Sequence, residues 1–206
     1  KYPKGGELFV SDTLTSIAAR RSIRRYSAEP VAQSTIAQLL LAAQQAPSAK
    51  NAQPWRFVVL QGSAALELAD IMKRSAAERT AAGVDVGSLP WSAAVIEQAP
   101  VTILVLNAAP PPDLETGATD DYQFVMIQST GAAIENMLLA AQAMGLGSLW
   151  ICDVLYCAPQ ILAWLAREQQ TLVAAIALGH AAEAPGARPR IPWEQLTEWR
   201  GAPAAG

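Results

Sequence analysis

Residues 47–55 read Pro47-Ser48-Ala49-Lys50-Asn51-Ala52-Gln53-Pro54-Trp55, a polar segment bracketed by prolines. An apolar run, Phe57–Leu60, follows directly, so we expect a loop that leads into a β-strand. Asn and Gln each carry a donor and an acceptor on one side chain, which suits the edge of a uracil-like ring. The same amides can instead satisfy the backbone of the loop itself, and for this loop taken alone that explanation is the more common one.

Helical and extended patterns alternate on both sides of this loop. Apolar residues at i, i+3, i+4 and i+7, namely Ile36, Leu39, Leu40 and Ala43, predict one buried stripe on the preceding helix. We expect helices over residues 13–19, 33–45, 64–82, 92–98, 120–145 and 159–168, and strands over residues 57–60, 101–106, 148–152 and 172–178. Residues 83–90 and 108–119 are expected to be surface segments. This alternation over a single domain, residues 1–206, indicates an α+β or α/β class.

For two of the expected helices we also predict the capping residue and the buried face. Asp12 is a candidate N-cap for the helix of residues 13–19, whose inner face should hold Leu14, Ile17 and Ala18. Asp120 is a candidate cap for the long helix that Gly145 ends. The main face of that helix is expected to hold Ile127, Gly131, Ile134, Leu138 and Ala141.

The long helix also needs a comparison with membrane spans. Between Tyr122 and Cys152 the only charged residue is Glu135, but polar residues interrupt the stretch repeatedly. We therefore interpret it as a buried core helix and expect no membrane association. It is apolar on more sides than one chain of this size can cover, which favours a dimer. Gly131, Ala132 and Ala133 would permit close packing against a second helix.

Composition excludes several classes of function. The chain has 206 residues, 51% of them hydrophobic and 16% charged, so a globular core is expected rather than disorder. The net charge of -3 does not favour nucleic acid as a partner. Two cysteines, Cys152 and Cys157, and a single histidine, His180, predict neither a disulfide framework nor a metal site. A reducing cytoplasmic location is the default expectation.

Arginines gather in two places despite the acidic balance. Arg20, Arg21, Arg24 and Arg25 fall within the segment Arg20-Arg21-Ser22-Ile23-Arg24-Arg25-Tyr26, and Arg188-Pro189-Arg190 forms a second group. Guanidinium forks and a serine hydroxyl match the oxygens of a phosphate monoester. Each group alone could equally be a solvated basic turn.

A further segment, Gly145-Leu146-Gly147-Ser148-Leu149-Trp150, contains two glycines that would let the backbone approach a planar ligand closely. It lacks the third glycine of a dinucleotide-binding fingerprint and follows a helix rather than a strand. A simple helix stop and turn is the alternative.

The order and spacing of these four motifs resemble the nitroreductase family of flavoproteins. The resemblance covers roughly Leu14 to Glu198, and residues 47–55 are its most specific part. It implies an α+β fold with a central mixed, mainly antiparallel sheet flanked by helices. It also implies an intertwined homodimer with FMN at the subunit interface, in which an arm of about residues 180–206 wraps the partner.

The resemblance also implies roles for particular residues, none of which follows from composition or spacing. Arg20, Ser22, Arg188 and Arg190 would hold the phosphate and ribityl chain, with Arg21 less certain. Arg24 would lie near the pyrimidine end of the ring. Ser48 and Asn51 would reach across from the other subunit. The backbone of Leu149, Trp150, Ile151 and Cys152 would lie along the ring, and the expected cofactor site also includes Pro47 and Gln53. Cys152 could equally be a buried, inert thiol, and His180 is expected to be structural.

The implied activity is the reduction of small nitro, quinone or enone-type acceptors. NADH or NADPH would deliver a hydride to FMN in a ping-pong scheme that needs no catalytic side chain. Three alternatives remain open. The chain could be an FMN-binding carrier or sensor without turnover, a specialised relative such as a dehalogenase or heterocycle dehydrogenase, or an anion-binding protein without flavin.

Overall fold

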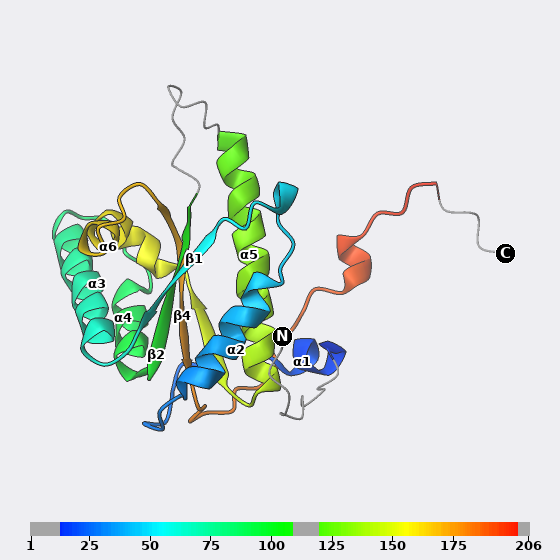
Figure 1. Cartoon of the computed structure of the whole chain (residues 1–206), viewed down its shortest axis with the longest axis horizontal. Helices are drawn as coiled ribbons and strands as arrows, with labels where there is room; N and C mark the ends of the chain where they lie inside the picture. Colours follow the sequence, from blue (N-terminus) through cyan, green and yellow to red (C-terminus); the bar gives the residue numbers. More distant parts are fainter. Residues whose placement is uncertain (1–12, 109–119, 202–206) are drawn as a thin grey trace.

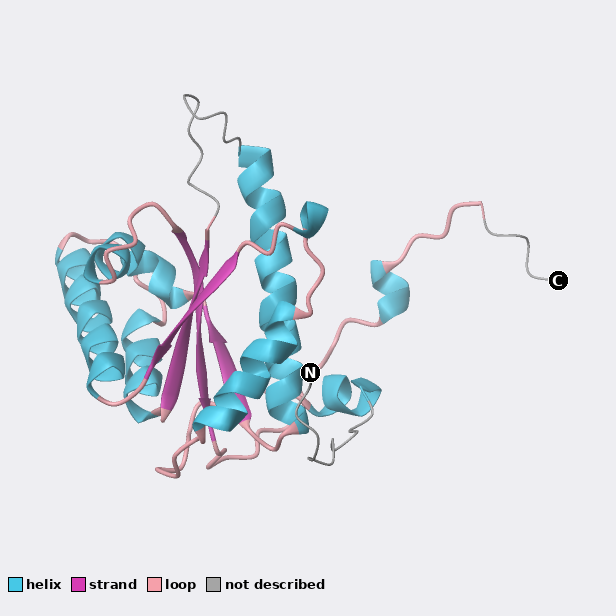
Figure 2. Cartoon of the chain, in the orientation of Figure 1, coloured by secondary structure: helices cyan, strands magenta, loops and turns pink. Residues whose placement is uncertain are grey.

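The computed structural model describes residues 13–108 and 120–201, in which helices cover both faces of a central sheet (Figure 1, Figure 2). The candidate cap Asp12, the side chain of Asp120 and residues 109–119 of the expected loop lie outside the described part. The α-helices are α1 (Thr13–Ala19), α2 (Gln33–Gln44), α3 (Ser63–Ala81), α4 (Leu89–Gln98), α5 (Asp120–Ala143) and α6 (Ala158–Trp164). Short 3-10 turns are η1 (Ala49–Asn51), η2 (Asp153–Cys157) and η3 (Trp193–Leu196).

The sheet contains β1 (Trp55–Leu60), β2 (Val101–Asn107), β3 (Gly147–Ile151) and β4 (Thr171–Gly179) in the order β1-β2-β4-β3. Each pair of neighbouring strands is antiparallel, with Val59 opposite Ile103 and Leu104 opposite Ala175. One parallel bridge, from Ser22 to Ser148, adds to the outer edge of β3. The expected α+β class is therefore confirmed, and β3 forms an edge of the sheet.

The central strands bury both faces because side chains alternate along a strand. In β2, Ile103 and Val105 enter a core shared with α2 and α5, whereas Leu104 and Leu106 enter the opposite core with α3 and α4. All seven residues of β2 are buried. The sheet is thus the middle layer between two apolar cores, a layer arrangement that buries one face of each helix.

Helix α5 packs on the sheet beside α2, as a core helix does, although residues 121–143 are also long and apolar enough to span a membrane. Ile134, Leu138 and Ala141 are buried as expected. Ile127 and Gly131, which were placed on the same face, are only half-buried. The face is rotated toward Thr130, Ala133 and Met137, because α5 must contact both α2 and the sheet.

Several element boundaries differ from those expected. Helix α4 begins at Leu89, inside the segment expected to be a surface loop, because Pro90 fits the first turn of a helix, where its missing N–H costs no hydrogen bond. Helix α6 ends at Trp164 rather than near residue 168, and Ala166 then takes a positive φ of 53°. The short turn η3 was not expected.

The interpretation of the α1 face was wrong for a single protomer. Leu14 and Ile17 are 72% and 53% exposed, and the buried residue of this helix is Ser16. The C-terminal arm, after residues 180–182 have paired with residues 25–27, likewise runs away from the body of the protein and carries exposed Trp193 (Figure 1). Both segments therefore offer apolar surface that their own chain does not cover.

The two glycines after α5 serve the fold. Gly145 has φ +74°, and the N–H of Leu146 bonds to the carbonyl of Ala141 at 2.8 Å, which closes the helix end. At Gly147 a Cβ would lie 2.8 Å from Cγ2 of Ile23. Gly145 is therefore required by its positive φ and Gly147 by the close approach of Ile23, and the approach of a planar ligand to this segment stays an expectation.

This contact predicts the effect of a substitution. Gly147→Ala should destabilise the protein by about 1–3 kcal/mol, because the added methyl overlaps the β-branched Ile23 and the backbone of β3 must shift. Urea denaturation at matched pH measures the change. Gly186→Ala is the control, since no atom lies within 4 Å of its Cβ position.

The pair can be tested further with Ile23→Ala in the Gly147→Ala background. Ile23→Ala removes Cγ1 and Cγ2, two of the three close atoms, so the double variant should be more stable than the sum of the two single changes predicts. Additive losses would show that Ile23 does not limit the space at Gly147.

Candidate functional site

Backbone hydrogen bonds bring the two arginine groups together, although the sequence separates them widely. Ile23 N–H bonds to the Ser148 carbonyl of β3 at 2.9 Å, on one side of the segment. On the other side, Ser27 N–H bonds to the His180 carbonyl and Ala182 N–H bonds to the Arg25 carbonyl, both at 2.9 Å. Residues 22–27 are therefore held between β3 and the start of the C-terminal arm.

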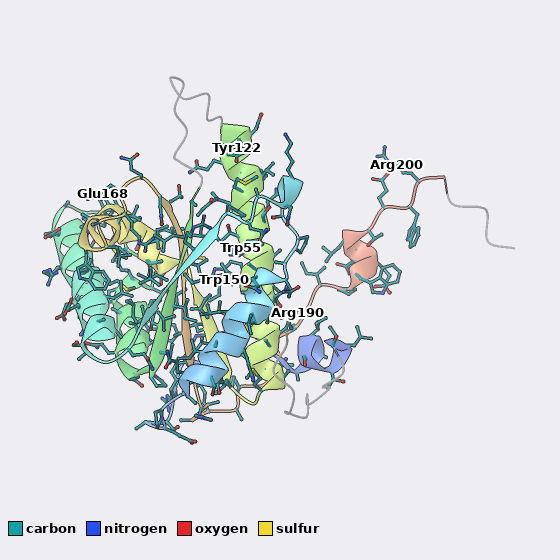
Figure 3. All side chains as sticks on the ribbon, viewed as in Figure 1. Trp55, Tyr122, Trp150, Glu168, Arg190 and Arg200 are labelled. Atoms are coloured by element: carbon teal, nitrogen blue, oxygen red, sulfur yellow. The ribbon has the colours of Figure 1, made fainter. Side chains whose placement is uncertain are left out.

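A cavity of about 570 Å³ lies where these segments meet. Among the residues that the structure describes, five arginines line it and none of the lining residues is acidic. The lining comprises Ile17, Ala18, Arg20, Arg21, Ser22, Arg24, Pro185, Gly186, Ala187, Arg188 and Arg190. Figure 3 shows Arg190 on the stretch of arm that leaves the body beside α1. We call this cavity the arginine pocket.

The side chains of Arg20 and Arg21 are held differently. Arg20 Nε lies 3.8 Å from a carboxylate oxygen of Glu135 on α5, and no described residue accepts a hydrogen bond from its terminal nitrogens. Arg21 Nη1 instead donates to the carbonyls of Ala18 and Arg20 at 2.7 and 2.8 Å. Arg20 thus offers free donors to the pocket, whereas Arg21 satisfies carbonyls at the end of α1.

Arg24 is fixed at three points. Its backbone N–H donates to a carboxylate oxygen of Glu183 at 2.5 Å, and its Nη1 donates to the Ser22 carbonyl at 3.1 Å. Its guanidinium carbon lies 5.2 Å from the ring centroid of Trp91 at the start of α4, a cation-π distance. These contacts hold the charge of Arg24 beside the pocket.

Tyr26 anchors the same segment from the core. Its buried hydroxyl lies 2.7 Å from the Ile23 carbonyl and 3.2 Å from the Ala177 carbonyl. Burial, reinforced by the carboxylate of Glu183, raises the pKa of Tyr26 well above its ordinary value. The hydroxyl therefore stays a neutral donor at physiological pH and serves the fold.

Beyond the arginine pocket, the end of β3 runs along the edge of the sheet. Leu149 and Ile151 bury their side chains, so only their backbone can face a ligand, while Trp150 is 36% exposed. Cys152 is exposed in the protomer, and the alternative of a buried thiol is wrong. Partial desolvation by its neighbours still raises the pKa of Cys152, so the thiol is neutral at physiological pH.

The loop of residues 47–55 does not line the arginine pocket of its own protomer. Lys50, Asn51 and Gln53 all adopt positive φ, between 46° and 54°, a conformation that costs non-glycine residues energy. The Oγ of Ser48 accepts a hydrogen bond from the Gln53 N–H at 3.0 Å. Part of the loop thus satisfies its own backbone, while Asn51 stays exposed.

Sequence patterns did not identify several residues around the pocket. Glu135 and Glu183 had no motif to mark them, although each is an acidic residue that contacts an arginine of the first group. His180 has no role in the pocket lining, and its Nε2 lies 3.5 Å from a carboxylate oxygen of Glu29.

Comparison with known proteins relates this arrangement to one family. The family model described as the nitroreductase family matches residues 17–180. The NADH dehydrogenase of Thermus thermophilus is 30% identical, over 93% of this chain and 97% of its own. The 5,6-dimethylbenzimidazole synthase of Rhodobacter capsulatus is 30% identical, over 69% of this chain and 72% of its own.

Structural comparison agrees with the sequence comparison. A protein from Desulfovibrio desulfuricans, assigned as a nitroreductase and crystallised in complex with FMN, superposes with a TM-score of 0.72. It is 31% identical, and the match covers 94% of this chain and 99% of that protein. The chain belongs to the nitroreductase family.

Proposed function

We propose that this chain is an FMN-dependent oxidoreductase that reduces small nitro, quinone or enone-type acceptors with NADH or NADPH. The observation that supports this most is the convergence of five arginines on one cavity. Arginines held this close together repel one another unless an anion offsets their charge. A phosphate monoester supplies nearly two negative charges and three acceptor oxygens. The FMN in the Desulfovibrio relative is a ligand with such a group.

The donor set fits FMN better than FAD. Arg20 has free terminal nitrogens, and Arg188 and Arg190 line the same cavity from the arm, so all three can contact a terminal phosphate. Ser22 adds a neutral donor at the same place. In FAD the phosphate continues into a second phosphate and an adenosine, so it offers no free monoester end to these arginines.

The other residues have roles that follow from their position. Arg24 would place a positive charge beside the ring, where it favours the anionic reduced flavin. The edge of β3 from Leu149 to Cys152 would present backbone groups to the ring. Bound FMN supplies the electron transfer between a nicotinamide donor and an organic acceptor. No side chain needs to act as an acid or base, and a ping-pong scheme fits one shared site.

The acceptor is the least constrained part of the proposal. The Rhodobacter relative carries the name of a benzimidazole synthase, so the family includes specialised chemistry, and a dehalogenase or heterocycle dehydrogenase stays as an alternative. A carrier or sensor that binds FMN without turnover would use the same arginines.

We also propose that the active species is a homodimer. The loop of residues 47–55 lies away from the arginine pocket of its own chain, so Ser48, Asn51 and their neighbours Pro47 and Gln53 would serve the pocket of the second chain. Exposed apolar side chains on three separate elements support this association. They include Leu14 and Ile17 on α1, Tyr122 and Phe124 on α5, and Ile191, Trp193, Leu196 and Trp199 on the arm.

The phosphate assignment predicts a selective loss of affinity. Arg20→Ala or Arg190→Ala should weaken FMN binding by about 10- to 150-fold, because each removes a charge-assisted contact of about 1.5–3 kcal/mol. The two losses should be less than additive, since both side chains meet one small anion. Fluorescence titration of the apoprotein with FMN measures the effect.

Riboflavin and a neighbouring arginine provide the controls. Riboflavin lacks the phosphate, so its affinity should not change in either variant. Arg25→Ala should leave FMN affinity unchanged, because Arg25 is exposed and lies outside the pocket lining. Equal weakening of FMN and riboflavin, or unchanged FMN affinity in the Arg20 and Arg190 variants, would refute the phosphate assignment.

The dimer proposal predicts the mass of the native species. Light scattering at micromolar concentration should give twice the 21.8 kDa of one chain. Replacing both Trp193 and Trp199 with Ser should weaken association at least about 10-fold, because buried tryptophans dominate interface energies. Val84→Ser, at another exposed apolar position, should not change the mass. A stable wild-type species of 21.8 kDa would contradict the proposal.

A further inference from the structure

A second cavity, of about 490 Å³, lies between the end of α3 and the turn η2. Its lining is formed by Arg79, Cys152, Asp153, Leu155 and Tyr156. Cys152 directly follows β3, the strand whose edge we assigned to the flavin ring. This cavity, which we call the η2 cavity, therefore begins where the proposed cofactor site ends, although no role proposed above uses Arg79 or Tyr156.

Arg79 brings an unpaired positive charge to the η2 cavity. Its guanidinium carbon lies 6.0 Å from the ring centroid of Tyr156, and within the described ranges no carboxylate lies at ion-pair distance from it. A guanidinium that lies over an aromatic ring keeps its N–H groups at the edge of its plane available for an acceptor. Half-burial of Arg79 lowers the cost of binding an anion there, because fewer waters must be displaced.

The acidic residue in the wall is already engaged. One carboxylate oxygen of Asp153 accepts hydrogen bonds from the hydroxyls of Ser88 and Ser92 at 2.6 and 2.5 Å. These bonds tie Asp153 to the first turn of α4 instead of to Arg79. The neutral thiol of Cys152 adds no negative charge.

The positive charge of Arg79 also acts on a second thiol nearby, that of Cys157. Burial raises the pKa of Cys157 to about 11, and the charge of Arg79 opposes that rise. The positive charge of Arg79 is therefore effective in the buried interior beside the η2 cavity. The wall of the η2 cavity thus holds one cation, Arg79, one carboxylate, Asp153, whose Oδ2 is hydrogen-bonded to two hydroxyls, and the neutral surfaces of Leu155 and Tyr156.

We propose that the η2 cavity binds the carboxylate of a planar aromatic acceptor, with Arg79 as the anion ligand and Tyr156 as the stacking surface. This inference rests on the proposed function, because it names a substrate class for that site. A carboxylate matches the guanidinium fork with two parallel hydrogen bonds. An aromatic ring attached to it can pack against Tyr156, whose face or edge favours another ring. The acceptor would extend from there toward Cys152 and the edge of β3.

Calorimetric titration of the flavin-loaded protein tests the site without turnover. The probes are 2-naphthoate and its uncharged amide, 2-naphthamide. We expect naphthoate to bind more tightly than naphthamide, and Arg79→Gln to weaken naphthoate at least about 10-fold, the loss of one charge-assisted contact. Arg79→Lys should retain part of the affinity, because it keeps the charge but loses the fork.

Matched variants separate the contributions of charge and ring. Arg74→Gln removes an exposed arginine of the same helix and should leave naphthoate binding unchanged. Tyr156→Phe keeps the ring and should bind naphthoate nearly as wild type does, whereas Tyr156→Ser should weaken both probes. Naphthoate affinity that is unchanged in Arg79→Gln, or equal to naphthamide affinity in the wild type, would overturn the proposal.

A second assay on the same flavin-loaded protein separates failure of this proposal from failure of the proposed function. Reduction of a neutral quinone by the wild-type protein with NADH or NADPH tests the oxidoreductase assignment and involves no carboxylate. Quinone reduction together with Arg79-independent naphthoate binding would reject the η2 cavity alone. Absence of FMN from the purified protein would reject the function itself.

Discussion

Electrostatic repulsion among five arginines is the constraint on which the proposed site depends. Two unit charges 4 Å apart repel by about 4 kcal/mol at an effective dielectric constant near 20, so such a group stays together only if the backbone is fixed or an anion is present. Here the backbone is fixed, and two carboxylates beside the pocket supply part of the opposite charge. Hydrogen bonds to β3 and to the arm fix residues 22–27, and Glu135 and Glu183 offset part of the charge without entering the pocket lining.

The same constraint explains why two ends of one chain belong to one site. The arm reaches the pocket only because residues 180–182 pair with residues 25–27, directly after β4 ends. Beyond this pairing the arm leaves the body with its tryptophans exposed. The loop of residues 47–55, which does not line the arginine pocket, has positive φ at three non-glycine residues and an exposed amide at Asn51. In the proposed dimer each of these features gains a partner that its own chain cannot provide.

The spacing of apolar residues along the sequence was sufficient to predict most of the helices and strands. The stripe of Ile36, Leu39 and Ala43 and the apolar run of β2 identified buried elements, because both patterns reflect local geometry. The faces of α1 and α5 were assigned less well, since a single sequence does not show which apolar surface would contact the second chain of the proposed dimer. The arginine pocket was expected from the family resemblance. The contacts of Glu183 and Trp91 were not, because they depend on long-range packing that no local pattern records.

The central claim is that the bound flavin exchanges electrons with a nicotinamide donor. Anaerobic mixing of the purified yellow protein with NADH, and separately with NADPH, followed by the visible absorbance of the flavin, tests this claim most directly. The account predicts that at least one donor bleaches the flavin within seconds and that an added quinone restores the colour. A flavin band that neither donor changes would contradict the enzyme assignment and support a carrier or sensor, and a colourless protein would contradict the flavin site.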